Sequence, residues 1–282
     1  MLRSPRRSLP LALAVGLLTT GGVLVADRVQ AQDDELDEGL EGGQGEPRQV
    51  LQRAIEAMGG ADALKAVVGA ALTFDGGADA GVSERHTLRL DGRQLHYASR
   101  DAGGAGFDVV LARGAAFLCD RGPDGQATYV EDLAPEDARE AAYERDMLFM
   151  PLLLPSLLAD PRAALEHKGK SSQGEAVIKA VVHPAEGNPG ATPFLVRLRF
   201  DPTSGLLTTA MGTIPCGADQ GRKRYLGFLE PKRAGRLLLP HRYADQRSKD
   251  VAPREVAVAW ALDAAVEPAL FQRPTLLRKE GR

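Results

Sequence analysis

The side chains that most often carry out chemistry are present, but their spacing defines no reaction. A zinc hydrolase needs histidines paired at helical spacing, whereas the five histidines here are scattered: His86, His96, His167, His183 and His241. A serine nucleophile on a strand-to-helix elbow requires GxSxG, and segment 81–85 lacks the closing glycine. The sequence also has no phosphate-binding glycine loop and no dinucleotide fingerprint. We therefore expect no catalytic residue, no metal and no cofactor, and we rank a hydrolase third among the function classes.

One segment comes close to a calcium site. Asp120, Asp124, Gly125 and Glu131 occupy positions one, five, six and twelve of an EF-hand-like loop. Position three is Gly122, which has no side-chain oxygen, and the flanks have the alternation of strands rather than the period of helices. A hairpin turn is therefore the preferred interpretation.

Only two cysteines are present, Cys119 and Cys216. They are too few for a disulfide scaffold or a cysteine-based zinc site. In an oxidising compartment they can pair and stabilise the fold. Two separately buried thiols are the alternative.

The N-terminus has the pattern of a secretory signal. Arg3, Arg6 and Arg7 precede an apolar stretch at 9–26, and small residues stand before a cleavage point after Ala31. The sequence therefore predicts an exported, periplasmic or extracytoplasmic protein whose signal peptide covers 1–31. An uncleaved membrane anchor is the alternative, because 9–26 just reaches spanning length.

The rest of the chain divides by composition. Residues 32–46 are rich in Asp, Glu and Gly and contain too few apolar residues to fold, so we expect a disordered acidic linker. Residues 47–275 are predicted to form one domain, and 276–282 a tail. The formal net charge of −3 does not suit binding to nucleic acid, so we expect no nucleic-acid partner.

Within the domain, helical periodicity comes first and strand alternation follows. Pro47 suits a first helical turn, and the apolar residues of 50–58 share one helical face until Gly59. From 72 onward, short alternating runs are separated by turn residues such as Asp91-Gly92. The connections are too short for crossover helices, so the pattern predicts an antiparallel sheet of about ten to twelve strands.

A helical insert interrupts the strands. Pro135 begins a helix, and the following stretch 147–159 is almost wholly apolar yet too short to span a membrane. It is either a buried helical pair that caps the sheet or a movable apolar lid over a cavity. The lid candidates are Met147, Leu148, Leu152 and Leu153.

The order of these features resembles the outer-membrane lipoprotein carrier and sorting family, whose half-barrel fold is shared with periplasmic sigma-factor regulators. The resemblance is carried by segments 54–64, 90–92, 200–205, 239–240 and 260–263, followed by Pro268 and Phe271. It implies an α+β fold in which a strongly curved antiparallel sheet wraps around a few helices. It also implies that the concave apolar face holds acyl chains.

If the resemblance holds, alternate apolar side chains line that concave face. The candidates are Leu88, Leu90, Leu95, Tyr97, Val109, Leu111, Phe194, Val196, Leu198, Phe200 and Trp260. Plain core packing is the alternative for each of them, because a strand face alternates in the same way against helices or against a ligand.

Two functions follow from this interpretation. The first is a non-catalytic periplasmic protein that binds a lipid or the acyl chains of a lipoprotein. The second is an envelope sensor or interaction module, in which the same fold recognises a protein partner and its own helices fill the cavity.

Overall fold

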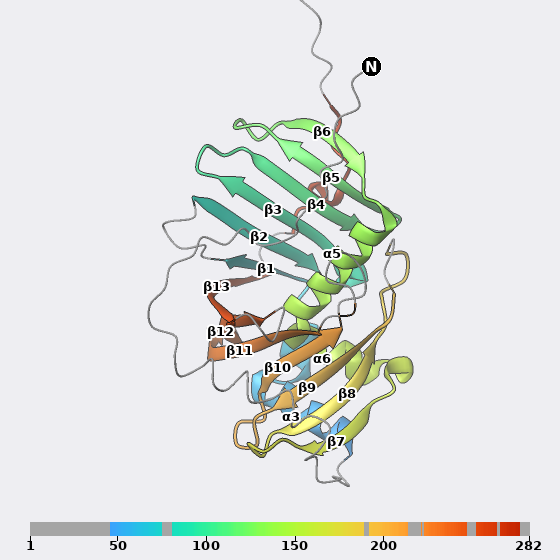
Figure 1. Ribbon diagram of the computed structural model, residues 1–282, viewed down its shortest axis with the longest axis vertical. Coiled ribbons are helices and arrows are strands. Elements are labelled where there is room, and N and C mark those ends of the chain that lie inside the picture. The colour runs from blue at the N-terminus through green and yellow to red at the C-terminus, as the bar shows by residue number, and fades with distance from the viewer. Residues whose placement is uncertain are drawn as a thin grey trace, which may run out of the picture.

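Short alternating segments form a sheet of thirteen antiparallel strands (Figure 1). The computed structural model describes residues 46–74, 81–188, 192–213, 221, 223–246, 252–263 and 266–276. The strands are β1 (Gly69–Phe74), β2 (Val82–Arg89), β3 (Gln94–Asp101), β4 (Gly106–Ala112), β5 (Ala115–Arg121), β6 (Ala127–Asp132), β7 (Glu166–Lys170), β8 (Ala176–Val182), β9 (Phe194–Phe200), β10 (Leu207–Thr213), β11 (Lys223–Ala234), β12 (Leu237–Gln246) and β13 (Arg254–Leu262).

The strands follow one another as a meander with a single long-range pairing. Their order is β6-β5-β4-β3-β2-β1-β13-β12-β11-β10-β9-β8-β7. Leu72 of β1 therefore faces His86 of β2 on one side and Trp260 of β13 on the other. This pairing joins the two halves of the chain, and the sheet ends at β6 and β7 without closing.

Turn chemistry sets the register of neighbouring strands. Ala112 of β4 pairs with Ala115 of β5 across Arg113 and Gly114. Gly114 has a φ of 76°, a conformation that glycine adopts without the strain of a side chain. A two-residue turn at Arg113-Gly114 therefore joins β4 to β5.

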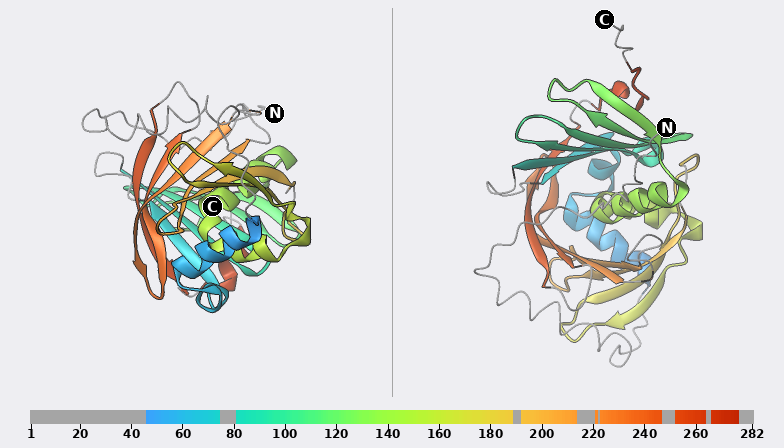
Figure 2. Two further views of the ribbon diagram at one scale, coloured as in Figure 1. Left: turned by 90° about the horizontal axis from the view of Figure 1, so that it is seen from below. Right: turned by 45° about the horizontal axis from the view of Figure 1, so that its top comes forward.

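The sheet curves around helices that lie on its concave side (Figure 2). The helices are α3 (Pro47–Met58), α4 (Ala61–Lys65), α5 (Pro135–Leu148) and α6 (Met150–Ala159), with short 3₁₀ turns η1 (Asp91–Arg93), η2 (Pro161–Ala163) and η3 (Pro268–Phe271). The predicted fold class, an α+β half-barrel with a curved antiparallel sheet, is confirmed.

The sequence explains where these helices begin and end. Pro47 occupies the first turn of α3, and Gly59 terminates it with a φ of 131°. Glu136 and Asp137 stand in the first turn of α5, where the helix dipole favours negative charge. The chain turns from α5 into α6 at Phe149, and Pro151 occupies the first turn of α6.

The alternating pattern in the sequence did not predict strand β7. β7, Glu166–Lys170, reads EHKGK and has almost no apolar residue. As an edge strand it pairs only with β8, and charged residues on an edge discourage pairing with other chains. Because its residues are polar or glycine, β7 shows no alternation of apolar and polar residues in the sequence.

The concave face is the centre of the core. Its strand side chains and the inward faces of α3, α5 and α6 belong to one continuous hydrophobic cluster. Leu88, Val196, Leu198 and Leu154 have no exposed surface. The helices therefore cover the apolar face of the alternating strands.

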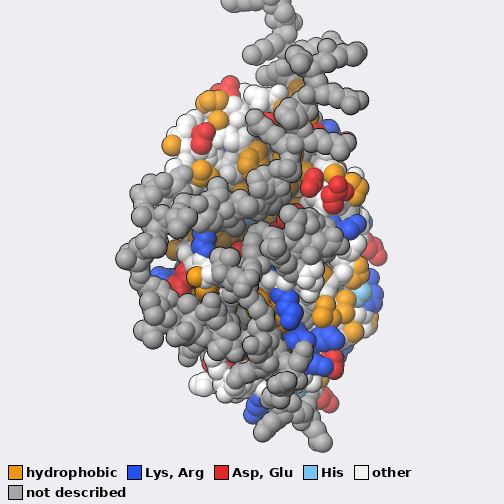
Figure 3. Space-filling model, in the orientation of Figure 1, with side chains coloured by type: hydrophobic (Ala, Val, Ile, Leu, Met, Phe, Trp, Pro, Cys, Tyr) orange, Lys and Arg blue, Asp and Glu red, His pale blue; other side chains and the backbone are white. Residues whose placement is uncertain are grey.

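The C-terminal segment covers part of the convex face. η3 contacts β3 and β4, and Phe271 packs with Val110, Phe117 and Cys119. In the view of Figure 3, Lys and Arg side chains gather on the half of the molecule that β7 to β10 form in Figure 1.

Candidate functional site

The predicted lining residues lie together on the concave side. Nine of them are buried, and Leu90 and Trp260 are partly buried against the same cluster. Leu90 lies just beyond the end of β2, and the indole of Trp260 donates a hydrogen bond of 2.6 Å to the carbonyl oxygen of Pro240. All of these residues belong to the hydrophobic cluster that also contains the buried side chains of the helices, and their contact with a ligand stays a prediction.

The lid candidates also lie inside the curve of the sheet. Met147, Leu148, Leu152 and Leu153 are buried in α5 and α6. The two helices contact each other, α6 also contacts α3, and α5 contacts β4. In this structure the apolar stretch is the buried helical pair that caps the sheet. Movement of that pair stays a prediction.

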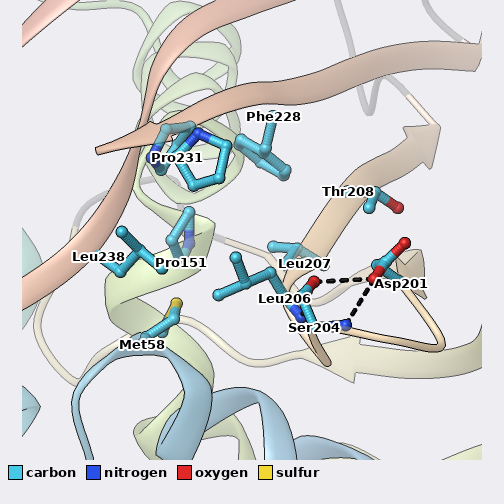
Figure 4. A pocket seen from close by; sticks show the side chains of 11 residues that line it. Met58, Pro151, Asp201, Ser204, Leu206, Leu207, Thr208, Phe228, Pro231 and Leu238 are labelled. Atoms are coloured by element: carbon cyan, nitrogen blue, oxygen red, sulfur yellow. Dashed lines mark hydrogen bonds between the residues drawn. The ribbon is translucent and has the colours of Figure 1, made fainter. Parts of the chain in front are cut away.

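An open pocket lies beside these helices, and it is lined by a different set of residues. It has a volume of about 270 Å³. Its walls come from the end of α3, the start of α6, the turn after β9, and β10 to β12 (Figure 4). The lining residues are Met58, Pro151, Asp201, Ser204, Leu206, Leu207, Thr208, Phe228, Pro231, Leu238 and Pro240.

Two prolines shape one wall of the pocket. Pro231 of β11 pairs directly with Pro240 of β12, and neither can donate a backbone hydrogen bond to the ladder. Glu230, just before Pro231, has a positive φ of 50°. The regular pairing of β11 and β12 is therefore interrupted beside Pro151 of α6, where the pocket lies.

The opposite wall is the turn between β9 and β10. Asp201 Oδ1 accepts hydrogen bonds from the backbone nitrogens of Thr203 at 3.0 Å and Ser204 at 2.6 Å, and from Ser204 Oγ at 2.8 Å. These bonds, chiefly that from the Ser204 backbone, lower the pKa of the Asp201 carboxyl. The pocket thus combines apolar walls with one fixed carboxylate.

Sequence reasoning missed this pocket. In the sequence, segments 200–205 and 239–240 indicate only a family resemblance. A proline in each of two neighbouring strands was the available signal, because central strands rarely contain proline. Nothing in the sequence indicates that Met58 lines the pocket, because its place there depends on how α3 packs against the sheet.

A buried ionic cluster ties α5 to the sheet. Arg224 of β11 is fully buried. Its Nε and Nη2 donate to the two carboxylate oxygens of Asp245, each at 2.8 Å, and its Nη1 donates to Glu144 of α5. Burial alone would lower the pKa of Arg224, but the carboxylates of Asp245 and Glu144 outweigh it and raise that pKa. The guanidinium therefore stays charged and holds the helix in place.

The next two residues of α5 make a second connection. Arg145, which has no exposed surface, donates from Nε to Asp146 at 2.8 Å and from Nη1 to the carbonyl oxygen of Arg93. Arg93 in turn donates to the carbonyl oxygen of His183 at 2.9 Å. This cluster links the loop after β2, helix α5 and the segment after β8.

The two histidines on neighbouring strands point to opposite faces of the sheet. Tyr97 pairs with His86, and the adjacent His96 pairs with Thr87, so alternation separates the two imidazoles. The ring of His86 packs 4.5 Å from Tyr97 and 5.1 Å from Phe74, and burial lowers the pKa of His86 to about 3. Across the described part of the chain, no three His, Cys, Asp or Glu side chains are grouped to hold a metal.

Two other candidates are also placed. Segment 120–131 is a hairpin made of the end of β5, a turn at 122–126 and most of β6. In the turn, Asp124 Oδ1 accepts a hydrogen bond from the backbone of Gln126 at 3.0 Å. Cys119 is buried and forms no disulfide within the part of the chain that the structure describes. Cys216 lies outside the described residues, so its pairing stays a prediction. In the described portion, no helix has the length and apolar character needed to cross a membrane.

Comparisons with known proteins find likeness in solved structures. No protein-family model matches the chain, and no curated protein matches it. A DUF1329 family protein from Desulfovibrio piger is similar with 12% sequence identity and a TM-score of 0.46, over 81% of this chain and 98% of that one. A LolA superfamily protein from Nitrosomonas europaea is similar with 11% identity and a TM-score of 0.44, over 80% of this chain and 97% of that one.

A third similar structure is the lipoprotein LppX of Mycobacterium tuberculosis. Its identity is 11% and its TM-score 0.24, over 60% of this chain and 87% of that one.

Proposed function

We propose that this protein is exported and binds the acyl chain of a lipid or of a lipidated protein, without catalysing a reaction. The observation that carries the proposal is the open pocket of about 270 Å³ between α3, α6 and strands β10 to β12. Eight of its lining residues are apolar: Met58, Pro151, Leu206, Leu207, Phe228, Pro231, Leu238 and Pro240. Export rests on the signal pattern of residues 1–31.

The physical basis is the burial of methylene groups. Each methylene removed from water contributes about 0.8 kcal/mol, so part of an acyl chain gains several kcal/mol in such a pocket. A volume of 270 Å³ is slightly below that of pockets that enclose a whole drug-sized ligand, about 300 to 1,000 Å³. The rest of a longer chain would therefore lie outside the pocket, beyond its open side.

The second candidate is an interaction module. Its support is that the predicted lining residues already pack against helical side chains in one continuous cluster. If that packing persists in solution, the fold needs no ligand inside. A protein partner would then bind elsewhere on the surface.

Mass spectrometry of the intact exported protein tests the proposal. The protein is purified after export and measured under native conditions, and a lipid or lipid fragment is expected to remain bound. After delipidation, a fluorescent acyl probe should bind with one saturable site. An exported protein that carries no lipid and binds no acyl probe would overturn the proposal and favour the interaction module.

A matched pair of variants connects binding to the pocket. Leu238→Gln places an amide in the pocket wall and should weaken binding of the acyl probe about tenfold, equivalent to about 1.4 kcal/mol. Leu195→Gln is the control, because Leu195 of β9 is 40% exposed and does not line the pocket. Equal binding by both variants would place the acyl site elsewhere.

A further inference from the structure

The polar side of the pocket presents hydrogen-bond acceptors and one negative charge. Figure 4 shows Asp201, Ser204 and Thr208 on one side, facing Phe228, Pro231 and Leu238 on the other. Among the described residues that line the pocket, Asp201 is the only charged one, and none is basic. The lining is therefore strongly asymmetric in its polarity.

The two hydroxyl groups in this wall have no proton to offer a ligand. Ser204 Oγ donates its proton to Asp201 Oδ1 at 2.8 Å. The proton of Thr208 Oγ1 is directed to Glu175 Oε1 at 2.8 Å or to the carbonyl oxygen of Arg199 at 3.1 Å. A hydroxyl has a single proton to donate, so both side chains face the pocket as acceptors.

Asp201 reinforces this pattern. Its Oδ1 accepts the three hydrogen bonds of the turn, whereas its Oδ2 accepts none from the residues that the structure describes. Those hydrogen bonds lower the pKa of Asp201, so the carboxylate is ionised at neutral pH. An anionic headgroup in the pocket would meet a like charge and find no side-chain donor. A buried polar group left unpaired costs free energy.

We infer that the pocket selects amphiphiles whose headgroup donates hydrogen bonds, with a primary ammonium group preferred over a hydroxyl and a carboxylate or phosphate excluded. This inference rests on the proposed acyl-chain function and specifies the ligand class for the same pocket. An ammonium group supplies three donors and a positive charge, which matches Asp201 Oδ2 and the acceptor oxygens of Ser204 and Thr208. The aliphatic chain lies along the apolar wall.

Three probes with the same chain and different headgroups test the inference. Decylamine, decanol and decanoate are titrated into the delipidated mature protein at neutral pH, below their micelle concentrations, by calorimetry and by displacement of a fluorescent acyl probe. Decylamine is expected to bind at least about tenfold more tightly than decanoate, with decanol between them, because a charge pair replaces a charge repulsion near Asp201. The preference for decylamine over decanoate should shrink as salt is added.

Asp201→Asn separates charge from turn structure. The asparagine side-chain oxygen can still accept the turn hydrogen bonds, but the negative charge is lost, so the preference for decylamine should fall by at least about fivefold. Asp101→Asn is the matched control, because Asp101 Oδ1 accepts similar turn bonds from Gly103 at 2.8 Å and Ala105 at 3.0 Å at the end of β3, outside the pocket. It should leave the preference unchanged.

The outcomes distinguish this inference from the proposed function. Equal affinity for the three probes, or tightest binding of decanoate, overturns the headgroup selection and leaves acyl binding in place. Binding of none of them overturns both. The comparison within the native protein needs no variant, so it decides the inference even if Asp201→Asn does not fold.

Discussion

The hydroxyl of Tyr243, on β12, donates a hydrogen bond of 2.9 Å to the carbonyl oxygen of Leu148 at the end of α5. Both residues are buried. The last carbonyl groups of a helix lack partners within the helix, and Leu148 is the last residue of α5 before the chain turns into α6. The sheet therefore fixes the point where the apolar helical pair bends.

Removing that hydroxyl should loosen the helical pair. Tyr243→Phe keeps the ring but leaves the Leu148 carbonyl without this donor, and we expect a loss of about 1 to 3 kcal/mol in the free energy of unfolding. Urea denaturation followed by circular dichroism measures the change. Tyr129→Phe is the control, because Tyr129 is exposed and its hydroxyl bonds to Glu131. Equal midpoints for the two variants would show that the bend is held by other contacts.

The Arg224 cluster should be sensitive to the loss of one partner. Arg224→Met leaves Glu144 and Asp245 without their buried guanidinium, and breaking such a cluster costs about 3 to 5 kcal/mol. Arg242→Met is the control, because Arg242 pairs with Glu230 and Glu255 on the surface, where ion pairs contribute little. Adding Glu144→Leu to Arg224→Met should restore part of the stability. A loss no larger than that of the control would contradict the role assigned to Arg224.

Gly212 lets α5 lie directly against β10. A Cβ atom at this position would lie 2.7 Å from Tyr143 Oη and 3.2 Å from Met147 Sδ. Gly212→Ala should therefore push α5 from the sheet and destabilise the fold by about 1 to 3 kcal/mol. Gly227→Ala on β11 is the comparison, since its Cβ would meet only Ala244, at 3.3 Å from its Cβ and 3.7 Å from its carbonyl oxygen. Thermal midpoints that fall equally would indicate a general cost of alanine rather than a clash with α5.

The Asp108 cluster predicts a dependence of stability on pH. Burial would raise the pKa of Asp108, but hydrogen bonds from His96, Arg100 and Arg121 outweigh it and hold that pKa below its ordinary value. The ionised form therefore stabilises the fold above the unfolded pKa of about 3.9, and this contribution is lost as pH falls below that value. Urea midpoints from pH 7 to pH 3 measure it.

Asp108→Asn isolates this contribution. The variant should be less stable than the native protein at pH 7 and lose less stability on acidification. Asp124→Asn, in the exposed turn between β5 and β6, should follow the native pH dependence. Parallel curves for the native protein and Asp108→Asn would assign the acid sensitivity to other carboxylates.

Local patterns in the sequence determined most of the secondary structure. Alternation from Phe194 to Phe200 places Phe194, Val196, Leu198 and Phe200 on one face of a strand. A turn such as Asp91-Gly92 joins one strand to the next along the chain. Pro47 and Pro135 marked the beginnings of α3 and α5. These features depend on neighbours along the chain, so they can be read without a structure.

The tertiary structure decided what each face meets. Leu88 and Leu198 alternate in the same way whether a helix or a ligand covers them, and only the packing of α3, α5 and α6 places helices there. Met58 and Pro240 line one pocket although they lie far apart in the sequence, because β12 and α3 meet in space. Arg224 and Glu144 likewise pair only once α5 enters the curve of the sheet. Local patterns encode the direction in which a side chain points, but long-range strand register and helix packing determine its partner.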